Sequence, residues 1–348
     1  MTDATERSPE SAAGRSVSVD GLATYLRCPR RYEFAHVHEL EGSDDSDVTA
    51  DRADLLRRAI CAALRSGETD VDGLFAVGRE RLSALWDDHD ERFHSRAQRR
   101  HERRVLEATL RAYLERVGVE HAAGIERLAA DATDAEPVGP SLSVSSTVSV
   151  PENTDPVPVE ATVDYLYVDG SSFVGVRFVP TLAPLGLLRY RSDWDGDVAD
   201  LFTDHFDADA DVFEPGAVSA LLETAVVLEG LRARRDRLGL EDRTCRYLRI
   251  PLADRSKATV NWIRGTVETS LEVMDLTDVY VDHLTYGMTH EHRNETVDDR
   301  LADVLGRLVT GSFDPSDRWD RIESHACPSC EYTVCCQEYI AREVAFDG

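Results

Sequence analysis

The sequence predicts a mixed α/β or α+β domain, on the basis of two observations. The first is a change of periodicity: a helical repeat of apolar residues occupies positions 52–128, and alternation of apolar and polar residues replaces it at 142–179. The second is the order helices, strands, helix, strand, helix along the chain. This order is typical of a central sheet flanked by helices, and we expect the N- and C-terminal pieces to pack together.

The first predicted elements are two short helices. Ser18 can cap a helix that Pro29 forces to end near Cys28, and Pro29 then suits the first turn of the second helix. The acidic stretch 41–54 predicts a solvated loop. The apolar repeat at 52–128 predicts two to four further helices.

Three successive strands are predicted between residues 142 and 179, and the turn pair Asp169-Gly170 joins the last two as a hairpin. The remaining predicted elements are a helix at 215–238, strands at 245–252 and 259–263, and a helix at 297–310. The sequence contains no internal repeat.

Charge is the most unusual feature of the composition. The chain has 66 acidic and 39 basic residues, a formal net charge of -27, and Lys257 as its only lysine. This composition resembles that of proteins from organisms that accumulate molar salt. At molar salt, charges are screened over about 3 Å, so the net charge does not exclude a nucleic-acid partner and only local basic patches matter.

The sequence predicts a cytoplasmic protein with no membrane partner. No run of 18 or more apolar residues occurs, and residues 1–16 are polar, without the apolar stretch of a signal peptide. We expect residues 1–16 to form a disordered tail. The chain has 7 cysteines, an odd number that favours metal binding or buried thiols over a disulfide framework, and Cys61 and Cys245 are expected to be buried thiols.

The strongest motif is the C-terminal CPSCEYTVCC. Cys327 and Cys330 have the C-x2-C spacing that brings two thiolates to one metal site, and Cys335 or Cys336 can supply a third ligand. The fourth ligand must be distant in sequence, and Cys28 is the best-placed candidate. Three clustered cysteines and a distant one fit an iron–sulfur cluster better than zinc, which stays as the alternative.

Both ends of the chain resemble one family. SVDGLATYLRCPRRYEF and GSFDPSDRWDRIESHACPSCEYTVCC are similar to the terminal cysteine motifs of the iron–sulfur RecB-like nucleases, which include the CRISPR-associated exonucleases and the AddB type. This resemblance implies the PD-(D/E)XK nuclease superfamily, with a restriction-endonuclease-like central sheet flanked by helices. It also implies that a 4Fe-4S cluster joins the two terminal segments. The implied ligands are Cys28, Cys327, Cys330 and Cys336.

The resemblance divides the chain into an N-terminal helical part at 17–140, a nuclease-fold core at 141–260 and a C-terminal helical part at 261–348. The first part carries one cluster cysteine and the last part carries three. The implied partner is DNA, single-stranded or branched, in DNA repair or processing, together with a repair or helicase protein.

The family's metal site combines a helix histidine, a first aspartate, a second acid two residues before a lysine, and a later Q-x3-Y helix. Its carboxylates hold a divalent ion that activates water. In the matching hairpin Asp164 stands at the first acid, but Gly175 replaces the second acid and Arg177 replaces the lysine. Arginine stays protonated and cannot serve as a tunable base.

Two other positions of the implied site also differ from the family. Cys61 stands at the histidine, where a thiol is a poor ligand for magnesium or manganese, and Ser219 and Glu223 stand at the Q-x3-Y positions. Lys257 is distant in sequence from Asp164. We therefore expect a DNA-binding protein whose cleavage is weakened or lost, with magnesium or manganese bound only if the site is active. The alternatives are an active metal-dependent DNA exonuclease and an interaction scaffold that holds a structural metal and binds no DNA.

The segment RFHSRAQRRHERR carries the densest group of basic residues. A phosphate-binding track on one helical face is expected at Arg96, Arg99, Arg100 and Arg103. The alternative is a solvated helix whose arginines pair with local acids such as Glu102 and Glu107. Arg30 and Arg31, beside the predicted cluster, form a second and smaller candidate patch.

Overall fold

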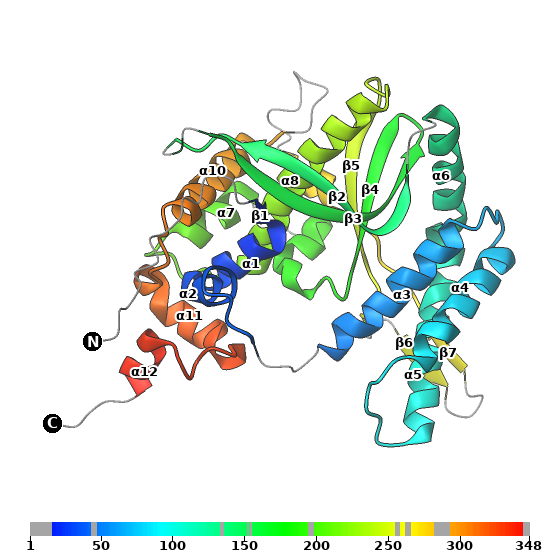
Figure 1. Cartoon of the computed structure of the whole chain (residues 1–348), viewed down its shortest axis with the longest axis horizontal. Coiled ribbons are helices and arrows are strands. Elements are labelled where there is room, and N and C mark those ends of the chain that lie inside the picture. The colour runs from blue at the N-terminus through cyan, green and yellow to red at the C-terminus, as the bar shows by residue number, and fades with distance from the viewer. Residues whose placement is uncertain are drawn as a thin grey trace, which may run out of the picture.

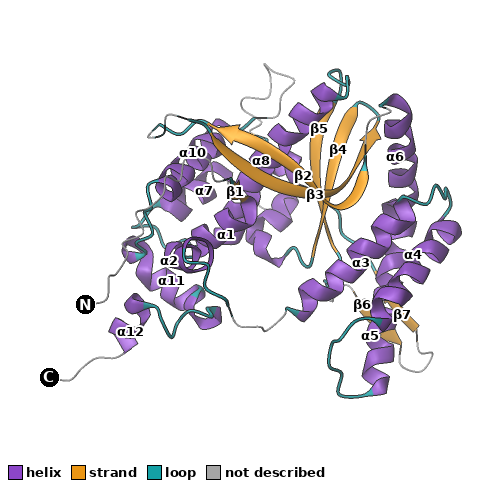
Figure 2. Cartoon of the chain, viewed as in Figure 1, coloured by secondary structure: helices purple, strands orange, loops and turns teal. Residues whose placement is uncertain are grey.

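The structure is a computed structural model in which a mixed sheet has helices on both faces (Figures 1 and 2). This arrangement confirms the expected mixed α/β architecture. The residues that the structure describes are 16–42, 47–132, 136–151, 153, 155–193, 198–254, 258–261, 266–281 and 293–343. In these residues, no helix combines the length and apolar character needed to cross a membrane.

Six strands form the central sheet. They are β1 (Val17–Ser18), β2 (Val138–Val148), β3 (Val157–Asp169), β4 (Ser172–Val179), β5 (Thr244–Pro251) and β8 (Met274–Asp275). Their order is β1-β3-β4-β5-β8, with β2 also paired to β3. β1 is parallel to β3 and β4 to β5, while the β2–β3, β3–β4 and β5–β8 pairs are antiparallel. The β3–β4 pair is the predicted hairpin, and β6 (Ala258–Asn261) pairs with β7 (Thr266–Thr269) in a separate ribbon.

The described residues also form α-helices and short π- and 3-10 segments. The α-helices are α1 (Val19–Arg27), α2 (Pro29–Tyr32), α3 (Val48–Leu64), α4 (Val71–Asp87), α5 (Arg96–Tyr113), α6 (Val119–Asp131), α7 (Val198–Phe206), α8 (Pro215–Arg237), α9 (Leu276–Tyr280), α10 (Glu295–Val309), α11 (Trp319–His325) and α12 (Gln337–Glu343). The π-segments are η1 (Glu33–Val37) and η2 (Leu114–Gly118), and the 3-10 segments are η3 (Ala183–Asp193), η5 (Ser316–Arg318) and η6 (Cys327–Ser329).

Side-chain caps set the starts of α1 and α3. Ser18 Oγ accepts a hydrogen bond from the Gly21 N–H at 3.0 Å, as predicted. The predicted loop at 41–54 is wrong beyond Asp47, whose side chain accepts from the Thr49 N–H at 2.9 Å and so begins α3. The reason is that Asp is a strong N-cap, and that Ala53 and Leu55 are buried after it.

Two apolar layers lie on opposite faces of the sheet. Val159 and Val163 of β3 belong to the layer that contains α1, α8 and α10, whereas Tyr165 and Tyr167 belong to the layer formed with α3 to α6. The side-chain alternation of β3 therefore changes phase at Asp164. α8 is buried on nearly all sides because it contacts the sheet as well as α1, α9 and α10.

The two terminal regions pack against each other, as expected: α2 lies beside α11 (Figure 1), and Cys28, between α1 and α2, packs with Ile322 of α11. The Tyr25 hydroxyl donates to the Ser312 carbonyl at 2.8 Å. Arg30 and Arg31 form ion pairs with Glu338 at 2.6 Å and Glu331 at 2.8 Å.

Candidate functional site

The four predicted cluster cysteines lie in one neighbourhood, where the two terminal regions meet. Cys28 follows α1, and Cys327 packs with it in a small apolar cluster that includes Ile322 of α11. Burial, together with the nearby thiols of Cys28, Cys330 and Cys336, raises the pKa of Cys327 to about 12. The structure therefore brings together residues from both ends of the chain.

Backbone N–H groups point at two of these thiols. Burial raises the pKa of Cys28, and hydrogen bonds from the N–H groups of Arg31 and Arg30 partly offset that rise. Burial also raises the pKa of Cys336 to about 11, against a hydrogen bond from the Tyr339 N–H. Such bonds favour the thiolate, which is the form that binds metal.

Cys335 has a different environment. It is exposed, and its Sγ donates to the Tyr332 carbonyl at 3.3 Å, whereas Cys336 is buried. A 4Fe-4S cluster takes cysteine thiolates as its ligands, and these four residues are of that type. Within the part of the chain that the structure describes, no group of three or more His, Cys, Asp or Glu side chains is arranged to hold a metal ion.

Asp164 lies where the side-chain alternation of β3 changes from one face of the sheet to the other, and neighbouring residues bury it. Its side chain is 2% exposed. Oδ2 accepts from the Phe178 N–H at 2.7 Å, Oδ1 accepts from the Ser141 N–H at 3.4 Å, and Arg57 Nη1 lies 3.7 Å from Oδ1. Burial raises the pKa of Asp164, although Phe178 and Arg57 act in the opposite direction.

Cys61 lies beside Asp164. Its buried Sγ donates to the Asp164 carbonyl at 3.9 Å. Burial and the neighbouring Asp164 carboxylate raise the pKa of Cys61, which keeps the thiol neutral. A neutral thiol does not supply the oxygen or imidazole ligand that magnesium or manganese requires.

Arg177 pairs with α8 and not with Asp164. Arg177 Nη1 lies 2.9 Å from Glu223 Oε2, and Arg249 Nη2 lies 2.5 Å from the same oxygen. The Tyr247 hydroxyl donates to the other oxygen of Glu223. Burial alone would raise the pKa of Glu223, but Arg249 and Arg177 lower it to about 2. Two guanidinium groups thus share one buried carboxylate.

A cavity of about 430 Å³ opens beside this network, between α1, β4 and the N-terminal half of α8. Asp20 lies on its lining and accepts from Arg177 Nη2 at 3.0 Å, and Arg27 also lines it. The sequence pattern indicates Arg177 and Glu223 as site residues, but it does not indicate Arg249 or Asp20. The available signal for Arg249 was its place two residues after Tyr247, on the same face of a predicted strand.

The four predicted arginines of α5 divide into two pairs. Arg99 Nη2 donates to the Trp86 carbonyl at 3.1 Å, and Arg103 donates to Glu107 at 3.0 Å and Ser83 at 3.1 Å. Both are therefore held by contacts to α4 or along α5. Arg96 and Arg100 are exposed.

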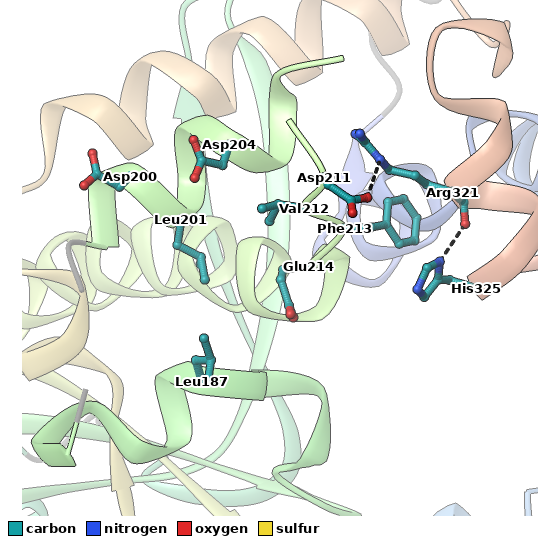
Figure 3. Close-up of a pocket in the computed structure, with 10 residues that line it drawn as sticks. All are labelled: Leu187, Asp200, Leu201, Asp204, Asp211, Val212, Phe213, Glu214, Arg321 and His325. Atoms are coloured by element: carbon teal, nitrogen blue, oxygen red, sulfur yellow. Dashed lines mark hydrogen bonds and ion pairs between the residues drawn. The ribbon is translucent and has the colours of Figure 1, made fainter. Parts of the chain in front are cut away.

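A second cavity, of about 590 Å³, lies between α7 and α11 (Figure 3). Its charged lining includes Asp200, Asp204 and Glu214, and also Asp211, which lies 3.9 Å from Arg321. Figure 3 shows apolar side chains such as Leu187 among these acids. The excess of carboxylates makes this cavity unsuitable for a phosphate.

Lys257 falls outside the described residues, so the structure does not locate this side chain. A scan of the chain against protein-family models and a search among curated proteins gave no match.

Proposed function

We propose that the protein is a DNA-binding, non-cleaving member of the iron–sulfur RecB-like nucleases that acts in DNA repair or processing. A 4Fe-4S cluster on Cys28, Cys327, Cys330 and Cys336 would join its two ends. A restriction-endonuclease-like core is supported by the β3–β4 hairpin, followed by α8 as the crossover to the parallel strand β5. The partner we expect besides DNA is a repair or helicase protein.

The environment of Asp164 carries the non-cleaving part of this proposal. Its carboxylate is buried and accepts two backbone hydrogen bonds, with Arg57 nearby. Magnesium and manganese need several oxygen ligands together with bound water, and a sealed single carboxylate does not supply them. Gly175 and Arg177 contribute no carboxylate, and the carboxylate of Glu223 is already paired with Arg177 and Arg249.

DNA binding is supported by local positive charge on an acidic chain. Arg96 and Arg100 are exposed on α5, and Arg27, Arg177 and Arg249 line the cavity beside α1. Phosphate contacts depend on such local groups when distant charges are screened.

The test of the proposed function is binding of fluorescent single-stranded and branched DNA in molar potassium chloride with EDTA. We expect saturable binding that is independent of sequence. Iron and sulfide analysis of the same anaerobically purified protein should show the cluster. Iron with no DNA binding would favour a scaffold, and stoichiometric zinc without sulfide would rule out the cluster.

A further inference from the structure

We propose that the cavity between α1, β4 and α8 binds a phosphate group of DNA through Arg177 and Arg249, without a divalent metal, and that Asp20 occupies the phosphate position in free protein. The inference rests on the proposed DNA-binding function and assigns its site. In this cavity the positive charge that a nuclease obtains from its metal comes from two guanidinium groups.

The charges at the cavity wall are not balanced by Glu223 alone. Arg177 and Arg249 are paired residues of the parallel strands β4 and β5, so their side chains lie next to each other. Their side chains are 18% and 11% exposed, and both contact Glu223 Oε2. One buried carboxylate balances only one of the two guanidinium groups. A poorly hydrated cation needs a further anion, and the cavity gives that anion access.

Asp20 lies at the solvent side of Arg177. This side chain is 77% exposed, yet its Oδ1 lies 3.0 Å from Arg177 Nη2. It thus supplies a second carboxylate from the solvent side. Exposed ion pairs contribute little stability, so an incoming anion can displace Asp20 at low cost. A phosphate offers the guanidinium more acceptor oxygens and a higher charge than a carboxylate does.

Other residues that line the cavity can also contact a phosphate. The side chain of Arg27, at the exposed end of α1, has no hydrogen bond or ion pair to any residue that the structure describes, so it is available for a second phosphate oxygen or for the next phosphate. Thr24, Thr181 and Ser219 add hydroxyl groups. Arg31 is already paired with Glu331 and is not needed.

The experiment compares three probes in molar potassium chloride with EDTA: a 5′-phosphorylated single-stranded oligonucleotide, the same strand without the phosphate, and inorganic phosphate. Asp20→Asn removes the internal competitor, and we expect it to tighten binding roughly three- to tenfold. Asp299→Asn makes the same change of net charge on an exposed position of α10 and should leave binding within about twofold. Arg177→Gln should weaken binding, with circular dichroism as the check on its fold.

Asp20→Asn is the decisive variant. The Asp20 side chain is exposed, so we do not expect its replacement to unfold the protein, and a change in binding can be assigned to the cavity. Tighter binding of either oligonucleotide supports the site. A preference for the phosphorylated strand assigns it to a DNA end, and equal binding assigns it to the backbone. If wild type binds DNA but Asp20→Asn and Asp299→Asn behave alike, the cavity assignment is overturned and the proposed function stands. Asp20-dependent binding of inorganic phosphate without binding of either strand would support the anion site and overturn the DNA-binding function.

Discussion

Gly175 lies in β4 beneath Leu231 of α8. A Cβ atom at Gly175 would lie 3.0 and 3.1 Å from the two Cδ atoms of Leu231 and 3.4 Å from Val163 Cγ1. The first two distances are tighter than ordinary van der Waals contact. The helix therefore occupies the space that a carboxylate at this position would need.

Placing the acid and the lysine of the proposed family at positions 175 and 177 should therefore produce no cleavage. We expect Gly175→Asp combined with Arg177→Lys to lower the free energy of unfolding by about 2 kcal/mol or more, because a carboxylate would be forced against leucine and Glu223 would lose a guanidinium partner. Denaturant unfolding in molar potassium chloride measures this. Gly139→Asp, which would approach only Leu142, should cost less. Equal costs would contradict the packing argument.

Glu223 gives a prediction with a definite pH window. Its pKa is lowered from 4.5 to about 2, so the stabilisation is present above the unfolded pKa of 4.5 and is lost as the pH falls towards 2. At neutral pH, Glu223→Gln should reduce the free energy of unfolding by on the order of 3 kcal/mol, because two arginines lose their carboxylate. The difference from wild type should shrink between these two pH values. A difference that stays constant across the window would exclude this role.

On α5, the phosphate track expected from sequence is divided by the packing of the helix on α4. Arg99 and Arg103 have structural contacts, while Arg96 and Arg100 are exposed. A test of DNA binding on this helix should therefore change only the exposed pair, since reversing the others would also disturb the α4–α5 contact.

We expect Arg96→Glu combined with Arg100→Glu to weaken binding to all DNA sequences alike. The slope of log affinity against log salt should fall by roughly 2, about one unit for each lost phosphate contact. Arg81→Glu combined with Arg116→Glu makes the same change of charge at exposed positions and serves as the control. Equal effects of the two pairs would mean that α5 is only a solvated helix.

Local signals in the sequence were sufficient for several elements and insufficient for others. The cap at Ser18, the β3–β4 hairpin and α8 follow from residues close together in the chain. The strand β1 was missed because it has 2 residues, too few to show alternation. The contact of Asp20 with Arg177 joins residues 157 positions apart, and the change of side-chain phase at Asp164 depends on packing from both faces.

For the whole molecule, α1 connects the two candidate sites. Cys28 ends this helix, close to the C-terminal cysteines. Asp20 and Arg27 of the same helix line the cavity between α1, β4 and α8. A cluster that fixes Cys28 to the C-terminal cysteines would therefore also fix one wall of the cavity. Metal binding of this kind adds its free energy to that of folding.

Two adjacent cysteines allow a matched test of the cluster ligands. Cys336→Ser and Cys28→Ser should lose iron and increase hydrogen exchange in α1 and α11 together, because one cluster holds both ends. Cys335→Ser should keep its iron, since Cys335 is exposed and lies outside the gathered thiols. Iron quantification and hydrogen-exchange mass spectrometry measure the two effects. If Cys335→Ser lost its iron and Cys336→Ser kept it, Cys335 and not Cys336 would be the cluster ligand.

We expect this protein to bind DNA without cutting it, and a cleavage assay measures whether it cuts. Labelled single- and double-stranded DNA would be incubated with the wild type and with Asp164→Ala in molar potassium chloride, with magnesium or manganese. Loss of one catalytic group typically costs about two to four powers of ten in rate, so we expect both proteins to remain at background. Cleavage by the wild type that requires both the metal and Asp164 would contradict the account.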